Sequence, residues 1–120
     1  MSWKNSIKSE KCIAVRLASI KDLARFAASM RTYGQHSYII HFEKEGKHYY
    51  GLFIVFRDYY KYYGLPLFYY VVMDSPIDGS YILVKADESG ESLEFSEGVR
   101  AGWIPVPIIT VEESPEIIPL

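Results

Sequence analysis

The sequence predicts an α+β fold in which one main helix packs on a mostly antiparallel sheet of about four to six strands. Three observations support this prediction. Residues 19–33 have the apolar spacing of a single amphipathic helix. Several other short segments are rich in β-branched and aromatic residues and are separated by turn-forming residues. The chain has 120 residues, the size of one domain with one hydrophobic core.

The predicted helix, residues 19–33, has a start signal, a stop signal and one apolar face. Ser19 and Asp22 form an S-x-x-D pattern, a variant of the capping box. Gly34 stands where a left-handed residue would end the helix. The apolar positions recur at helical spacing: Ile20, Leu23, Ala24, Ala27 and Met30.

Four strands are expected before residue 75. Residues 11–17 are β-branched and apolar, which predicts a first strand. Residues 37–43 and 48–57 alternate around a turn at Gly46 and predict a hairpin. Residues 67–73 are apolar throughout, which favours a strand covered on both faces.

The rest of the domain should contain a second hairpin and one irregular strand. The hairpin is expected from residues 81–86 and 91–95. In residues 103–110, Pro105 and Pro107 lack amide hydrogens, so this segment is predicted to be an edge strand or an extended arm. We interpret residues 1–111 as a single domain and residues 112–120 as an acidic and then apolar C-terminal tail.

The sequence favours a cytoplasmic location and no membrane span. No apolar run approaches the roughly 18 residues that a spanning helix needs, and the polar N-terminus does not resemble a signal peptide. Cys12 is the only cysteine, which excludes a disulfide within the chain and a cysteine-rich zinc site. Asn5 and Gln35 are the only side-chain amides, a scarcity typical of thermophile proteins.

Charge is divided unequally along the chain. Residues 1–72 contain eleven basic and five acidic side chains, whereas residues 73–120 contain two and ten. Such asymmetry indicates an anionic partner for the basic half, or else two ordinary surfaces that fold into one mixed field.

Aromatic residues occupy half of the positions from Tyr49 to Tyr70. Adjacent strand residues point to opposite faces, so one set can pack on the helix while the other needs a second role. Aromatic rings can stack on the bases of a single strand, and interleaved cations can neutralise its phosphates. The predicted nucleic-acid-binding residues are Arg31, Lys44, Lys47, Tyr49, Phe53, Arg57, Tyr59, Tyr60, Lys61, Tyr62 and Tyr63.

The same tyrosines could instead form a subunit or protein-partner interface, since aromatics are enriched there too. The sequence does not distinguish DNA from RNA. It also does not show which aromatics face solvent, because a shift of one residue in register exchanges the two faces.

The element order, the basic helix, the Tyr- and Phe-rich central strands and the acidic tail resemble the archaeal ThermoDBP-type single-stranded DNA-binding proteins and their shorter relatives. The resemblance covers about residues 11–111. It implies a helix packed on an antiparallel sheet, a hydrophobic cleft rimmed by basic residues, and self-association into a dimer or higher homo-oligomer.

No sequence pattern indicates an enzyme, a cofactor or a metal site. Nucleotide-binding glycine loops, the zinc-protease pattern and the nucleophile elbow are all absent. His41 and His48 straddle the predicted hairpin turn and could lie opposite each other. A catalytic zinc site needs three protein ligands, so we interpret them as a cross-strand polar pair.

Overall fold

The computed structural model describes residues 11–32, 37–54, 67–85, 93–113 and 116–119. The elements in these ranges, in chain order, are β1 (Lys11–Arg16), α2 (Ile20–Thr32), β2 (Ser37–Lys44), β3 (Lys47–Ile54), β4 (Leu67–Met73), β5 (Tyr81–Lys85), β6 (Leu93–Ser96), β7 (Trp103–Thr110) and β8 (Glu116–Pro119).

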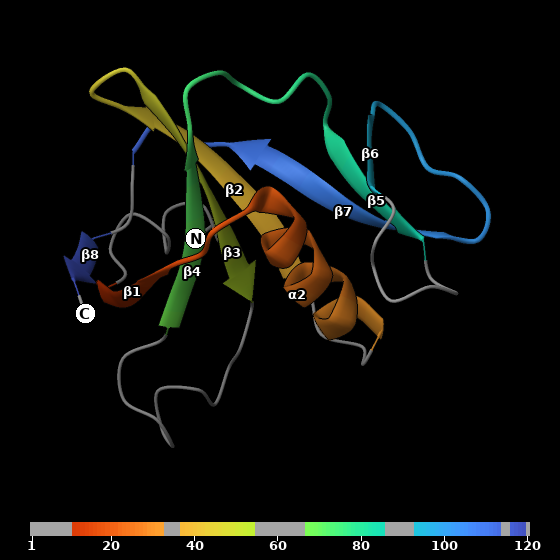
Figure 1. Cartoon of the computed structure of the whole chain (residues 1–120), viewed down its shortest axis with the longest axis horizontal. Helices are drawn as coiled ribbons and strands as arrows, with labels where there is room; N and C mark the ends of the chain where they lie inside the picture. Colours follow the sequence, from red (N-terminus) through yellow and green to blue (C-terminus); the bar gives the residue numbers. More distant parts are fainter. Residues whose placement is uncertain (1–10, 33–36, 55–66, 86–92, 114–115, 120) are drawn as a thin grey trace, which may run out of the picture.

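The predicted fold class is confirmed: α2 packs on one face of a mixed, mostly antiparallel sheet (Figure 1). Six strands, in the order β7-β2-β3-β4-β1-β8, form its main part. β7 also pairs with β5, which carries β6, so the continuous order runs through 8 strands. The parallel pairs are β1 with β4, β1 with β8, and β2 with β7.

The N-terminus of α2 is capped as the sequence predicts. The hydroxyl of Ser19 accepts a hydrogen bond from the amide of Asp22 at 3.2 Å. This bond satisfies one of the amides that the first turn leaves without an intrahelical partner. The cap therefore sets where the helix begins.

The far end of α2 is tied to the start of β2. The hydroxyl of the buried Ser37 donates to the carbonyl of Ala27 at 2.9 Å. The Arg31 guanidinium donates to the carbonyl of Ser37 at 2.7 Å. The hydroxyl of Ser37 can be buried at low cost because it has a hydrogen-bond partner inside the protein.

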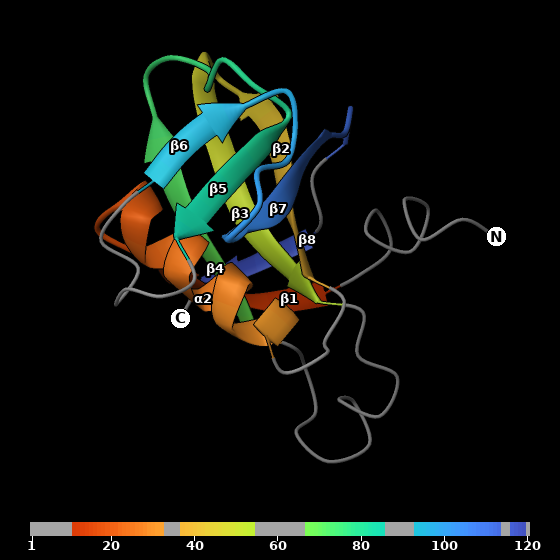
Figure 2. The ribbon, with the colours of Figure 1, turned by 90° about the vertical axis from the view of Figure 1, so that its right-hand side faces the viewer.

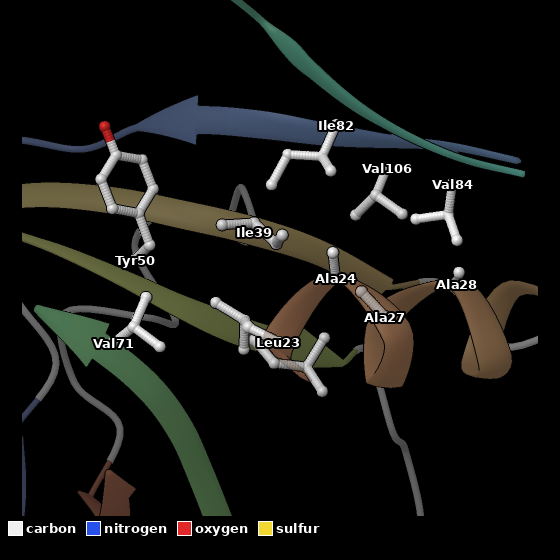
Figure 3. Packing of buried hydrophobic residues seen from close by; sticks show 11 residues of the cluster. Leu23, Ala24, Ala27, Ala28, Ile39, Tyr50, Val71, Ile82, Val84 and Val106 are labelled. Atoms are coloured by element: carbon white, nitrogen blue, oxygen red, sulfur yellow. The ribbon is translucent and has the colours of Figure 1, made fainter. Parts of the chain in front are cut away.

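The main core lies between α2 and one side of the sheet, which we call the helix face (Figure 3). Small residues on α2 let the helix approach the strands closely. The buried residues of this core are Leu23, Ala24, Ala27, Ala28, Ile39, Tyr50, Leu52, Val71, Ile82, Val84 and Val106.

The turn between β2 and β3 consists of Glu45 and Gly46. Both have positive φ, 53° and 78°, and Lys44 pairs with Lys47 in the ladder. Two left-handed residues in a two-residue loop are typical of a type I′ hairpin turn. The turn predicted at Gly46 is confirmed, and it fixes the register of the hairpin.

The prediction of an edge strand for residues 103–110 is wrong, because β7 lies between β5 and β2. The Ile108 amide donates to the carbonyl of Ser80 on the β5 side at 2.8 Å. Backbone groups alternate in direction along a strand, so the nitrogens of Pro105 and Pro107 point away from β5. On the other side, pairing with β2 begins only at Ile108. The nitrogens of the two prolines therefore point to a stretch of β7 that has no ladder with β2, so no amide donor is needed there.

Part of the predicted C-terminal tail forms a strand. Glu116 to Pro119 pair in parallel with β1 as β8. Among the described residues, no helix has the length and apolar character required to cross a bilayer.

Candidate nucleic-acid interface

The side of the sheet opposite α2 carries a row of aromatic side chains, and we call this side the aromatic face. Phe42, Tyr49, Phe68 and Tyr70 alternate with the helix-face positions of β2, β3 and β4. With Ile40 and Val111 they form a second apolar cluster. The sheet is therefore apolar on both sides, as the unbroken apolar run of β4 predicts.

The four rings form a continuous aromatic row. The ring centroids of Phe42 and Tyr49 lie 5.1 Å apart with an interplanar angle of 7°. Tyr49 stacks on Tyr70 at 5.9 Å, and Tyr70 stacks on Phe68 at 6.1 Å. Offset stacking at these separations adds about 0.5–1.5 kcal/mol per pair beyond area burial.

Gly51 gives this row its close contact with the backbone. A Cβ built at Gly51 would lie 1.9 Å from the tip of the Phe68 ring. The ring therefore occupies the place of the missing side chain, an arrangement that shields an otherwise weak glycine position in a strand. Phe68 is consequently only 2% exposed.

The two tyrosines of the row are half-buried, whereas the two phenylalanines are buried. Tyr49 has Phe42 and Tyr70 as ring neighbours, and Tyr70 has Tyr49 and Phe68. Their faces are thus used within the row. What they can offer a ligand is an apolar ring edge and a hydroxyl.

Cations lie around the aromatic row. Arg16 on β1 is the register partner of Tyr70 and is exposed. Lys44 and Lys47 pair across the end of the β2–β3 hairpin, and both are exposed. Lys47 also forms an ion pair with Asp74. The hydrogen bond and the charge of Lys47, in that order, lower the pKa of the Asp74 carboxyl.

The structure brings together part of the predicted site. Lys44, Lys47 and Tyr49 lie on the aromatic face near the hairpin end. Arg31 does not join them, because it bonds to Ser37 at the opposite end of β2. Phe53 is paired with Tyr38 in the backbone ladder. The remaining predicted residues lie outside the described residues: Arg57, Tyr59, Tyr60, Lys61, Tyr62 and Tyr63.

Sequence reasoning missed Arg16, Phe42, Phe68 and Tyr70 as members of this surface. The alternation of residues 67–73 indicated that one of Tyr69 and Tyr70 would face away from the helix, but not which one. Tyr69 in fact faces α2 and stacks on Phe26, with ring centroids 5.3 Å apart. Arg16 had no local signal, because its position depends on the parallel pairing of β1 with β4.

A second polar cluster lies on the helix face, formed by His41 and His48. They are diagonal neighbours, since the ladder pairs His41 with Tyr50 rather than with His48. Nε2 of His41 and Nδ1 of His48 are 2.9 Å apart, and Nδ1 of His41 is 3.0 Å from Oγ1 of Thr110. The His41 ring also stacks on Tyr50 at 4.6 Å.

The surroundings of this cluster shift two pKa values. Burial, followed by the neighbouring His48, lowers the pKa of His41, while Glu43 opposes the shift. Burial raises the pKa of Tyr50, and a hydrogen bond from the Ile77 amide to its hydroxyl at 2.6 Å opposes this. Both groups are therefore held in their neutral forms near neutral pH.

Within the described ranges, no three His, Cys, Asp or Glu side chains are grouped so that they could hold a metal ion. No protein-family model, curated protein or solved structure matches this chain. The similarity to the ThermoDBP-type proteins accordingly stays a prediction.

Proposed function

We propose that this protein binds single-stranded nucleic acid, with DNA the preferred form, on its aromatic face. The observation that supports this is the aromatic row itself: four stacked rings on the side of the sheet away from α2, with exposed cations beside it. Apolar ring surface can contact the bases of a flexible strand, and Arg16, Lys44 and Lys47 can contact its phosphates.

The geometry changes how the tyrosines would act. Since Tyr49 and Tyr70 already stack within the row, bases would pack edge-to-face on the rings and hydrogen-bond to the hydroxyls. Lys47 would contribute less than Arg16 or Lys44, because Asp74 already compensates its charge. A single strand suits such a surface because its bases are free to turn towards the protein.

The test is fluorescence anisotropy with labelled oligo-dT, oligo-U and a duplex, at low and moderate salt. The proposal predicts salt-sensitive binding to single strands in preference to duplex, with oligo-dT bound at least as tightly as oligo-U. Equal binding to duplex, or no binding at tens of micromolar protein, would refute it.

A second candidate function is a homo-oligomeric interaction module. The stacking within the aromatic row favours this function too. It leaves the ring edges and hydroxyls of the tyrosines for a partner, and these groups suit an interface with another protein. Here Tyr70→Ala should lower the molar mass measured by light scattering. An unchanged mass together with lost oligonucleotide binding would favour the first function. Under either function we propose a cytoplasmic location, supported by the single cysteine.

A further inference from the structure

The histidine pair, His41 and His48, lies on the helix face near the turn between β2 and β3. β7, β2 and β3 run side by side there, and the hairpin end of β2 and β3 lies away from α2 (Figure 2). Both imidazoles are half-buried, whereas Thr110 beside His41 and Glu43 opposite His48 are exposed. An ion in solution can therefore reach the pair.

The facing ring nitrogens of the pair are spaced like two ligands of one metal ion. Nε2 of His41 and Nδ1 of His48 are 2.9 Å apart. Bonds from imidazole to zinc are about 2.0–2.1 Å long, so two bonds of this length at a right angle separate their nitrogens by about 2.9 Å. Right angles between neighbouring ligands are typical of divalent copper and nickel, which prefer square-planar or tetragonal sites. A small turn of the two rings would direct both lone pairs at one ion.

Thr110 favours the tautomer of His41 that can bind a metal. Its Oγ1 is 3.0 Å from Nδ1 of His41. When the Nδ1 hydrogen is donated to this oxygen, Nε2 carries no hydrogen and its lone pair faces His48. Histidines that bind metals almost always donate their other ring hydrogen to an oxygen in this way. The His41 ring also stacks on Tyr50, which helps to hold its orientation.

Glu43 supplies a negative charge and a third ligand on the same side of the sheet. It is two residues from His41 on β2, hence on the same face, and the ladder pairs it directly with His48. In the described structure its exposed carboxylate is not grouped with the two imidazoles. Cross-strand partners have Cβ atoms about 4.5–5.5 Å apart, so a change of rotamer can bring this carboxylate to an ion held by the pair. Its charge also attracts a cation.

We propose that His41 and His48 bind one divalent transition-metal ion, copper in preference to nickel or zinc, and that Glu43 turns to become its third ligand. The ion replaces the hydrogen bond between the imidazoles. His48 then carries its hydrogen on Nε2, so the neutral pair binds the ion without losing a proton. Copper is preferred because nitrogen and oxygen sites bind it more tightly than nickel or zinc. The site is independent of the proposed function, because it lies on the helix face.

The first test is calorimetric titration of the full chain, without an affinity tag, with Cu²⁺ and with Mg²⁺. We expect one Cu²⁺ per chain and no binding of Mg²⁺, which prefers oxygen ligands. Thr110→Val should weaken Cu²⁺ binding about tenfold, and His41→Gln or His48→Gln should weaken it more. His36→Gln, which removes the third histidine of the chain, is the control and should leave the affinity unchanged. Equal weakening by His36→Gln, or Mg²⁺ binding as tight as that of Cu²⁺, would overturn the site.

The second test needs only the wild-type protein, so it does not depend on the folding of a variant. Electron paramagnetic resonance of the chain with one equivalent of Cu²⁺ should show a single species coupled to two imidazole nitrogens. In His41→Gln and His48→Gln this two-nitrogen species should be lost. A wild-type spectrum without imidazole coupling, or one that shows Cu²⁺ spread over several species, would overturn the proposal.

Discussion

At the scale of single residues, the contact of Phe68 with Gly51 holds the aromatic row against the sheet. The ring tip occupies the position where any other residue would carry its Cβ. A strand glycine is usually unfavourable, but here its absent side chain is replaced by a buried ring. The position therefore depends on glycine through packing, not through backbone conformation.

Gly51→Ala should destabilise the fold by about 1–3 kcal/mol, because the new methyl group forces Phe68 out of its place. Chemical denaturation measures this loss. Gly98→Ala is the control, since a Cβ at Gly98 meets nothing within 4 Å. Equal stability of the two variants would show that Phe68 does not need Gly51.

His41 should make stability depend on pH. Its pKa in the fold lies below the ordinary value of 6.5, so between these two pKa values the unfolded chain binds more protons. The stability that neutral His41 contributes is fully present above pH 6.5, and it is lost as pH falls from 6.5 through the pKa of His41 in the folded protein. Thermal melts between neutral pH and about pH 5 should show a smaller loss for His41→Gln than for the wild type. Parallel pH profiles would contradict this assignment.

At the scale of elements, α2 is defined by its cap and by its tie to β2. Ser19→Ala should cost about 0.5–2 kcal/mol of stability, because the Asp22 amide loses its acceptor. Ser29→Ala on the exposed side of the same helix should be neutral or slightly stabilising, because alanine is the better helix former. If both substitutions have equal effects on the urea midpoint, the capping role is wrong.

Local signals predicted the elements well. The S-x-x-D pattern located the start of α2, and Gly46 located the hairpin turn, because caps and turns depend on neighbours in sequence. β7 was misplaced because the rule against prolines in central strands applies to each side of a strand separately. Pro105 and Pro107 satisfy that rule on the side facing β2, before pairing with β2 begins.

At the scale of the whole molecule, the sheet separates two apolar surfaces. One is covered by α2, and the other carries the aromatic row. The sequence indicated that both faces would be aromatic, but it could not assign Tyr69 and Tyr70, since their directions follow from register with β1 and β3. The place of Arg16 beside Tyr70 likewise follows from the pairing of β1 with β4, which has no local signal in the sequence.

The charges around the aromatic face lead to a prediction about lysines. Lys44→Ala should weaken oligo-dT binding more than Lys47→Ala, because Lys47 already pairs with Asp74. Asp74→Asn should make Lys47 available and tighten binding. Anisotropy titrations of the three variants at one low salt concentration measure these effects. The reverse order of the two lysines would place the phosphate path elsewhere.

Binding on the aromatic face is tested by the salt dependence of oligo-dT binding for the wild type, Arg16→Ala and Lys21→Ala. If nucleic acid binds on the aromatic face, Arg16→Ala should lower the slope of log K against log salt by about 0.7, the value for one lost phosphate contact to a single strand. Lys21→Ala, on α2 and away from the aromatic face, should leave the slope unchanged. A slope lowered by Lys21→Ala but not by Arg16→Ala would contradict binding on the aromatic face.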